Sequence, residues 1–91
     1  MALETSFEAF YTYDEMVSFL DQAQTDHPQR LSLRSLTATP AGRDVLLAEI
    51  TDPATGAATD KPAYYIQAGL HAAEGAGTTA ALDVIRRLLY N

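Results

Sequence analysis

Hydrophobic residues change their spacing along this chain in an order that limits it to a small mixed fold. Between residues 13 and 26 they recur every three or four positions, the spacing of an α-helix with one apolar face. Thr12 and Glu15 have the form of a capping box at the start of this pattern, and Pro28 follows its end. We therefore expect an amphipathic helix from about residue 13 to residue 26.

Three shorter apolar runs follow, and each is typical of a β-strand. Leu31–Leu36 and Val45–Thr51 are separated by turn residues at Thr39–Gly42, so they predict an antiparallel hairpin. Ala63–Ala68 contains two tyrosines and one isoleucine without a charge, which predicts an interior strand. A helical pattern with a broad apolar face returns from about Gly75 to Leu89. The expected order is helix-strand-strand-strand-helix in an α/β fold.

The composition sets limits on size and partners. Ninety-one residues allow one domain at most, and the formal net charge of −6 argues against nucleic acid and anionic membranes as partners. The absence of cysteine excludes disulfides and thiolate metal sites. No segment reads as a signal peptide or a membrane span. We expect a soluble chain, cytoplasmic if Met1 is the native start, with the compartment otherwise open.

The third predicted strand and the second predicted helix are more apolar than a lone three-stranded sheet requires. A free domain of this size would expose one face and one edge of its sheet. The last helical pattern also continues to the final residues without a glycine cap. These features predict that residues 1–91 are a single incomplete domain.

The segment after the third predicted strand, G-L-H-A-A-E-G-A-G-T at 69–78, holds one of only two histidines. His71 and Glu74 can converge if the backbone between them makes one helical turn. An imidazole nitrogen and a carboxylate oxygen form a good partial ligand set for Zn²⁺. Taken alone, the pair also fits a surface histidine followed by an acid that is favoured near a helix N-terminus.

Five segments occur in an order that resembles a known family. They are Y-T-Y-D-E-M at 11–16, A-G-R-D at 41–44, I-T-D-P-A-T-G at 50–56, K-P-A-Y-Y-I at 61–66 and the segment at 69–78. This succession resembles the N-terminal part of the catalytic domain of zinc metallocarboxypeptidases, the carboxypeptidase A-like peptidase family M14. The resemblance covers nearly the whole chain from about Phe10. It implies the N-terminal portion of a three-layer α/β/α mixed-sheet fold.

The resemblance implies that His71 and Glu74 are the first two of three protein ligands to a catalytic Zn²⁺. The third ligand, the glutamate general base and the residues that hold the substrate carboxylate lie further downstream in the family, so we expect no catalytic residue within this chain. In the complete domain the ion would polarise the scissile carbonyl, and the glutamate would take a proton from the bound water. The implied substrates are the C-termini of peptides and proteins.

Arg43 is a candidate substrate-binding residue, because the resemblance implies that the arginine of this G-R turn can reach the outer part of the cleft. It fits equally well as a solvated turn arginine that pairs with Asp44 or with no group. The second histidine, His27, does not match the missing zinc ligand, and we expect it to be exposed at a helix end.

Tyr64 and Tyr65 are expected to be packing residues rather than catalytic ones. Asp52 and Asp60 are expected to solvate the loop between the second and third predicted strands.

Together these features predict the N-terminal fragment of a zinc-dependent metallocarboxypeptidase, inactive without the missing C-terminal part of its catalytic domain. One alternative is a small non-enzymatic α/β module that binds a partner chain. Another is a zinc-dependent deacylase of the same superfamily. Those deacylases usually have glycine directly after the histidine, so Ala72 favours the peptidase. Ala73 stands where many of the peptidases have glycine, which is a small steric change.

Overall fold

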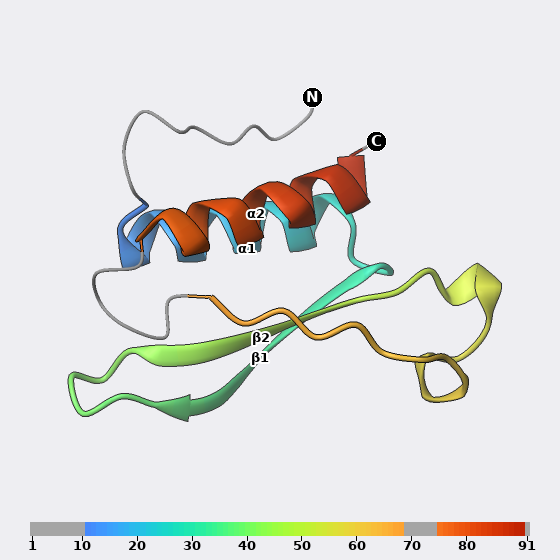
Figure 1. Cartoon of the computed structure of the whole chain (residues 1–91), viewed down its shortest axis with the longest axis horizontal. Coiled ribbons are helices and arrows are strands. Elements are labelled where there is room, and N and C mark those ends of the chain that lie inside the picture. The colour runs from blue at the N-terminus through green and yellow to red at the C-terminus, as the bar shows by residue number, and fades with distance from the viewer. Residues whose placement is uncertain (1–10, 69–74, 91) are drawn as a thin grey trace.

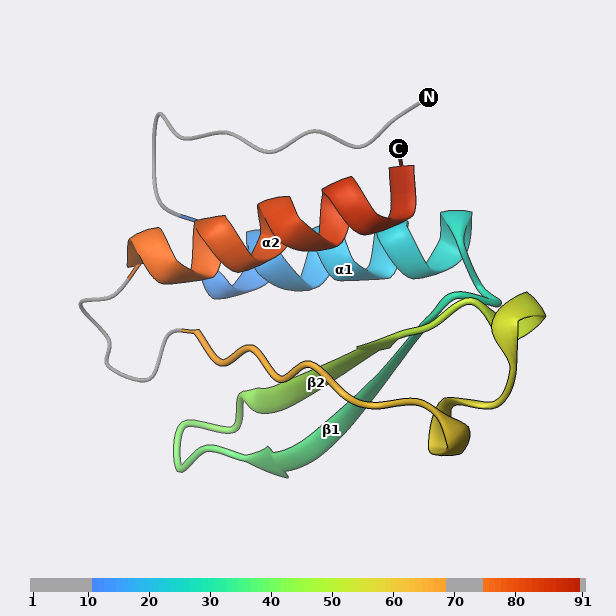
Figure 2. The ribbon, with the colours of Figure 1, turned by 45° about the vertical axis from the view of Figure 1, so that its right-hand side comes forward.

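Two helices lie side by side over one face of a β-hairpin in this computed structural model, which describes residues 11–68 and 75–90 (Figures 1 and 2). The elements in chain order are α1 (Tyr13–Asp26), β1 (Leu31–Ala38), β2 (Asp44–Ile50), the short 3₁₀ turns η1 (Pro53–Thr55) and η2 (Ala58–Asp60), and α2 (Gly75–Tyr90). Both predicted helices and the predicted antiparallel hairpin are confirmed, and so is the α/β class.

The start of α1 is fixed by the predicted capping box. The Thr12 hydroxyl accepts a hydrogen bond from the backbone N–H of Glu15 at 3.1 Å, and the Glu15 carboxylate accepts one from the backbone N–H of Thr12 at 2.8 Å. These bonds satisfy donors that a helix N-terminus otherwise leaves unpaired. Both bonds lower the pKa of the Glu15 carboxyl. The bond from the Thr12 backbone has the larger effect, and the bond that involves the Thr12 side chain has the smaller one.

The end of α1 is held by His27 and by the last turn of α2. The His27 carbonyl accepts hydrogen bonds from the backbone N–H groups of Arg30 and Leu31 and so turns the chain into β1. Its ring packs edge-to-face against Tyr90, with 4.6 Å between ring centroids. The Tyr90 hydroxyl donates a hydrogen bond to the Asp26 carboxylate. The prediction that His27 is exposed is therefore wrong, because α2 covers the imidazole.

The hairpin has one irregularity that sets which side chains face the helices. β1 and β2 pair from Leu31 opposite Ile50 to Ala38 opposite Asp44, with a register shift between Ser35 and Thr37. The intervening Leu36 is 57% exposed. The connecting turn passes through Gly42 with a φ of 82°, a backbone conformation that favours glycine because it has no Cβ.

The core consists of two small clusters in which both helices meet the inner face of the hairpin. One is centred on Phe19, Leu20 and Leu82, and the other on Ala23, Leu31 and Leu89. Partly buried residues of the hairpin pack against these clusters, namely Leu33, Leu46, Ala48 and Ile50. The alternating pattern of the strands therefore places one side of the hairpin against the apolar faces of the helices.

The third predicted strand does not form. Residues 62–68 are in neither a helix nor a strand, and the sheet has two strands among the described residues. The segment runs back along the hairpin towards the start of α2 (Figures 1 and 2). Tyr64 is 91% exposed and Tyr65 is 75% exposed, so the prediction that they pack is also wrong. An interior strand needs neighbouring strands and a covering layer of helices. In the described residues the two helices pack against β1 and β2 only.

We expect Leu31→Ala to destabilise the fold strongly. Leu31 is 1% exposed and touches residues from both helices, so truncation leaves a cavity that costs about 2–5 kcal/mol. Urea unfolding followed by circular dichroism measures the loss. Leu36→Ala on the same strand is the matched control, because truncation of this exposed side chain loses little buried surface. Equal losses in the two variants would contradict the assigned core.

We expect Tyr90→Phe to raise the pKa of Asp26. The bond from Tyr90 is the main cause that lowers the pKa of this carboxyl, whereas partial burial and then the bond to Asp26 raise the pKa of Tyr90 to about 12. NMR titration of the Asp26 carboxyl carbon checks the shift. Tyr64→Phe is the control, because that phenol is exposed, and an unchanged Asp26 titration in Tyr90→Phe would refute the link.

The same pair makes stability depend on pH at both extremes. The Tyr90 contribution is fully present below the ordinary pKa of 10.0 and is lost as the pH rises towards about 12. The Asp26 contribution is present above its ordinary pKa of 3.8 and is lost as the pH falls through its lowered folded-state pKa. In urea unfolding measured across these pH ranges, Tyr90→Phe should remove the alkaline dependence and weaken the acidic one, because Gln22 and His27 still lower the pKa of Asp26.

Candidate functional site

The predicted zinc ligands, His71 and Glu74, lie outside the described residues. The elements on either side of them are described. The segment 62–68 ends, and α2 begins, at the end of the molecule that also holds the hairpin turn and the start of α1 (Figures 1 and 2). The two flanks and the side chains at this end of the molecule are the described parts of the candidate site.

The downstream flank is held by the packing of α2 on α1. Thr79 and Leu82, in the first half of α2, are 2% and 3% exposed. Leu82 packs in one cluster with Phe19 and Leu20 of α1. The helix that follows Glu74 in the sequence is therefore seated on the core two turns after its start.

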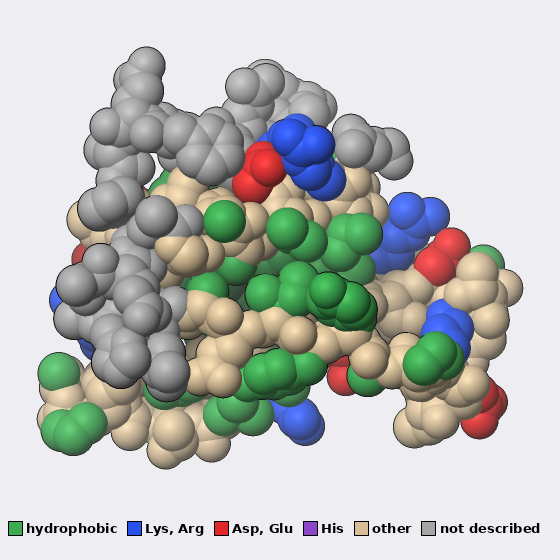
Figure 3. All heavy atoms as spheres, in the orientation of Figure 1, with side chains coloured by type: hydrophobic (Ala, Val, Ile, Leu, Met, Phe, Trp, Pro, Cys, Tyr) green, Lys and Arg blue, Asp and Glu red, His purple; other side chains and the backbone are tan. Residues whose placement is uncertain are grey.

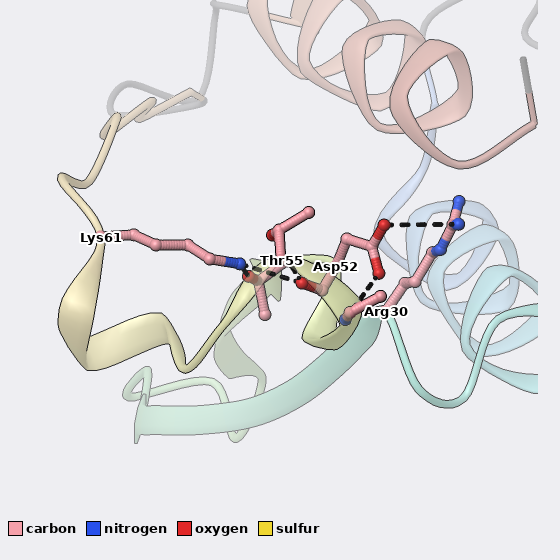
Figure 4. Close-up of polar contacts among 6 residues, drawn as sticks. Arg30, Asp52, Thr55 and Lys61 are labelled. Atoms are coloured by element: carbon pink, nitrogen blue, oxygen red, sulfur yellow. Dashed lines mark hydrogen bonds and ion pairs between the residues drawn. The ribbon is translucent and has the colours of Figure 1, made fainter.

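The upstream flank is anchored by Lys61, which immediately precedes the segment 62–68. Its ammonium donates hydrogen bonds to the Thr51 hydroxyl and to the Asp52 carbonyl, both at 2.9 Å (Figure 4). The Thr55 hydroxyl donates to the same carbonyl at 2.8 Å. These bonds close the loop after β2 on itself and fix the point at which the next segment leaves it.

Asp52 has a structural role in this loop rather than the solvating role that the sequence predicts. One carboxylate oxygen accepts a hydrogen bond from the backbone N–H of Ala54 at 3.0 Å and so caps η1. The other lies 3.7 Å from the Arg30 guanidinium (Figure 4). The two side chains are 48% and 42% exposed, and an ion pair this accessible to water contributes little, so we assign most of the ordering to the cap. Asp60 is exposed, as expected.

Arg43 lies in the hairpin turn, and its guanidinium is placed over an aromatic ring. The guanidinium carbon is 5.1 Å from the centroid of the Tyr13 ring, within the range of a cation–π contact. It does not pair with Asp44, whose carboxylate instead accepts a hydrogen bond from the Ser35 hydroxyl at 2.9 Å. Arg43 is therefore an exposed turn arginine that contacts the Tyr13 ring instead of Asp44, and its role in substrate binding stays a prediction.

Tyr13 is a residue that sequence reasoning missed. Its hydroxyl accepts a hydrogen bond from the backbone N–H of Asp44 at 2.9 Å and lies 3.2 Å from the Asp44 carbonyl, to which it donates. The first residue of α1 therefore fastens the hairpin turn directly beside Arg43. The sequence gives no local signal for this contact, because the two partners are far apart along the chain.

The rest of the described chain offers no alternative metal site and no membrane-spanning helix. Within residues 11–68 and 75–90, no three His, Asp or Glu side chains are grouped so that they could hold a metal ion. Neither described helix combines the length and the apolar character needed to cross a bilayer.

Comparison with known proteins identifies a family and a relative. Residues 16–91 match the model of the zinc carboxypeptidase family. The chain is also similar to carboxypeptidase A1 of Mus musculus, with 32% identity over 69 residues. That alignment covers 76% of this chain and 16% of the mouse protein, so the chain spans only a small part of the length of its relative.

We expect Lys61→Met to loosen the loop after β2 while the fold persists. The variant keeps the aliphatic stem but removes both ammonium bonds, which lowers the free energy of local opening by about 1 kcal/mol. Hydrogen exchange of the Ala54 amide, which reports the cap by Asp52, should become roughly five-fold faster. Arg34→Met on the exposed surface of β1 is the control. Unchanged exchange in Lys61→Met would contradict the anchoring role.

Proposed function

The chain belongs to the zinc carboxypeptidase family, and from this membership we propose that it is the N-terminal part of a zinc-dependent metallocarboxypeptidase that hydrolyses C-terminal peptide bonds. The observation that carries the proposal is the family match over residues 16–91, which includes the H-A-A-E segment between two described flanks. The substrates would be the C-termini of peptides or proteins.

In this proposal His71 and Glu74 are two ligands of a catalytic Zn²⁺. The donor chemistry fits, since imidazole nitrogen and carboxylate oxygen are common zinc ligands. A bound Zn²⁺ supplies a Lewis acid and lowers the pKa of a coordinated water. The residues of this chain would hold and orient the ion through the anchored upstream loop and the seated helix α2.

Two protein ligands leave a catalytic zinc site incomplete, because such sites use three. We therefore assign the third ligand and the general base to chain outside this sequence, and expect residues 1–91 alone to be inactive. The alignment over 16% of the mouse relative supports a larger catalytic domain. That larger domain is the proposed partner of this part of the chain.

Exposed apolar side chains support the same proposal. Tyr64, Tyr65 and Ile66 are 91%, 75% and 53% exposed, and Leu88 on α2 is 59% exposed. Figure 3 shows hydrophobic side chains gathered across the middle of one face, along α2 and the chain beside it. Exposed apolar surface of this kind commonly marks a site of contact with further protein. We propose that the remainder of the catalytic domain covers it.

The same surface favours one alternative, a non-enzymatic α/β module that uses it to bind a separate partner chain. The two functions differ in their need for metal. A module would fold and bind its partner without zinc, whereas the peptidase requires both the ion and the downstream residues. Metal content therefore separates them before any partner or substrate is known.

We expect the longest natural form of the protein to contain about one equivalent of zinc. Elemental analysis of the purified protein measures it, and release of C-terminal amino acids from peptides measures activity. His71→Ala and Glu74→Ala should each lower zinc content and abolish release. His27→Gln is the matched control, since His27 packs against Tyr90 instead.

Two results would contradict this proposal. Zinc content that stays unchanged in His71→Ala would remove the ligand assignment. Zinc-dependent release of amino acids by residues 1–91 alone would show that no downstream residues are needed. Circular dichroism of each variant confirms that a loss of zinc does not come from unfolding.

A further inference from the structure

We propose that Tyr13 positions Arg43 to bind an acidic side chain of the peptide substrate. Tyr13 would be a positioning residue, and Arg43 would make the contact. The inference rests on the proposed function, because that function supplies the peptide. The resemblance implies that residues further downstream hold the terminal carboxylate of the substrate, and a guanidinium without an ion pair also matches the carboxylate of an Asp or Glu side chain.

The cations of this acidic chain are mostly held by its own groups. Lys61 donates to Thr51 and Asp52, Arg30 lies near Asp52, and Arg86 and Arg87 both bind the carboxylate of Asp83. Of the six basic residues, two remain that form no ion pair with a described acid, and these are Arg34 and Arg43.

Arg43 differs from Arg34 because its guanidinium has an aromatic support. The Tyr13 ring lies 5.1 Å from the guanidinium carbon. Contact through the face of the ring leaves N–H donors free to form the planar fork that matches a carboxylate. Ordering the side chain before binding also lowers the entropy that a ligand has to offset.

The backbone of Arg43 is ordered as well. Its N–H donates to the Thr39 hydroxyl at 3.2 Å, and its carbonyl accepts from the Thr39 N–H at 2.7 Å. The Tyr13 hydroxyl bonds both backbone groups of the next residue, Asp44. Tyr13 therefore acts on Arg43 twice, through the ring beneath the guanidinium and through the anchored turn.

The turn that carries Arg43 lies at the end of the molecule where the segment 62–68 stops and α2 starts (Figures 1 and 2). The proposed zinc ligands lie between these two elements in the sequence. A peptide bound near those ligands would therefore extend on the same end of the molecule as Arg43. The net charge of −6 repels carboxylates from the rest of the chain. An ordered cation without an ion pair at this end would therefore be a preferred contact for a carboxylate of the peptide.

The first experiment titrates residues 1–91 with succinate while the arginine Nε–H signals are followed by NMR. We expect the Arg43 signal to shift with an affinity roughly three-fold above that of Arg34, and neutral succinamide to shift neither. Tyr13→Leu should bring Arg43 to the level of Arg34, and Tyr13→Phe should retain most of the difference. Equal shifts of the two arginines in the unmodified chain would overturn the proposal.

The second experiment uses the longest natural form and two peptides that differ only by Glu or Gln upstream of the scissile bond. We expect a preference for the Glu peptide in kcat/KM that falls roughly three-fold in Arg43→Ala and in Tyr13→Leu. Arg34→Ala should retain it. A purely structural loss would lower both peptides equally, and that result would overturn the proposal.

The two experiments separate failure of this inference from failure of the proposed function. Zinc binding that does not depend on His71 would remove the peptidase assignment, while the succinate titration would still report on Arg43. Normal zinc binding and cleavage without any preference for the Glu peptide would remove the role of Arg43 and leave the peptidase assignment intact.

Discussion

The burial of Leu31 between the two helices is the interaction on which the rest of the structure depends. This side chain begins β1 and packs in one cluster with Ala23 of α1 and Leu89 of α2. It therefore joins the hairpin to both helices at the end of the molecule opposite the proposed site. A chain of this size buries a smaller share of its surface than a larger domain does, so few contacts of this kind are available. The position of the helix that follows Glu74 depends on them.

The elements predicted correctly were those with strong local signals. The capping box at Thr12 and Glu15 and the helical spacing after it specify α1, and the turn residues around Gly42 specify the hairpin. The segment 62–68 has the composition of an interior strand but is exposed in the described chain. Its apolar and aromatic residues indicate that it could pack inside a sheet. Whether it forms a strand depends on the presence of neighbouring strands. Strand formation is more dependent on context than helix formation, and this segment shows that difference.

The family was predictable from the sequence, but the surroundings of the candidate site were predictable only in part. The pattern H-A-A-E and the order of the segments around it identify the family, which the comparisons confirm. The contacts of Tyr13 with Asp44 and of His27 with Tyr90 join residues far apart in the sequence, so no local pattern could reveal them. The sequence predicts that Asp52 solvates its loop, whereas its carboxylate caps a short turn. The long-range contacts of single side chains and the cap of η1 by Asp52 are therefore what the sequence did not predict.

The irregularity in β1 also affects how this chain behaves towards copies of itself. In the described residues β1 pairs only with β2, so its other edge presents backbone donors and acceptors. The extra residue between Ser35 and Thr37 interrupts the regular repeat of those groups and increases the local twist. A strand from another molecule would meet an edge that is not straight, which disfavours the stacking that leads to fibrils.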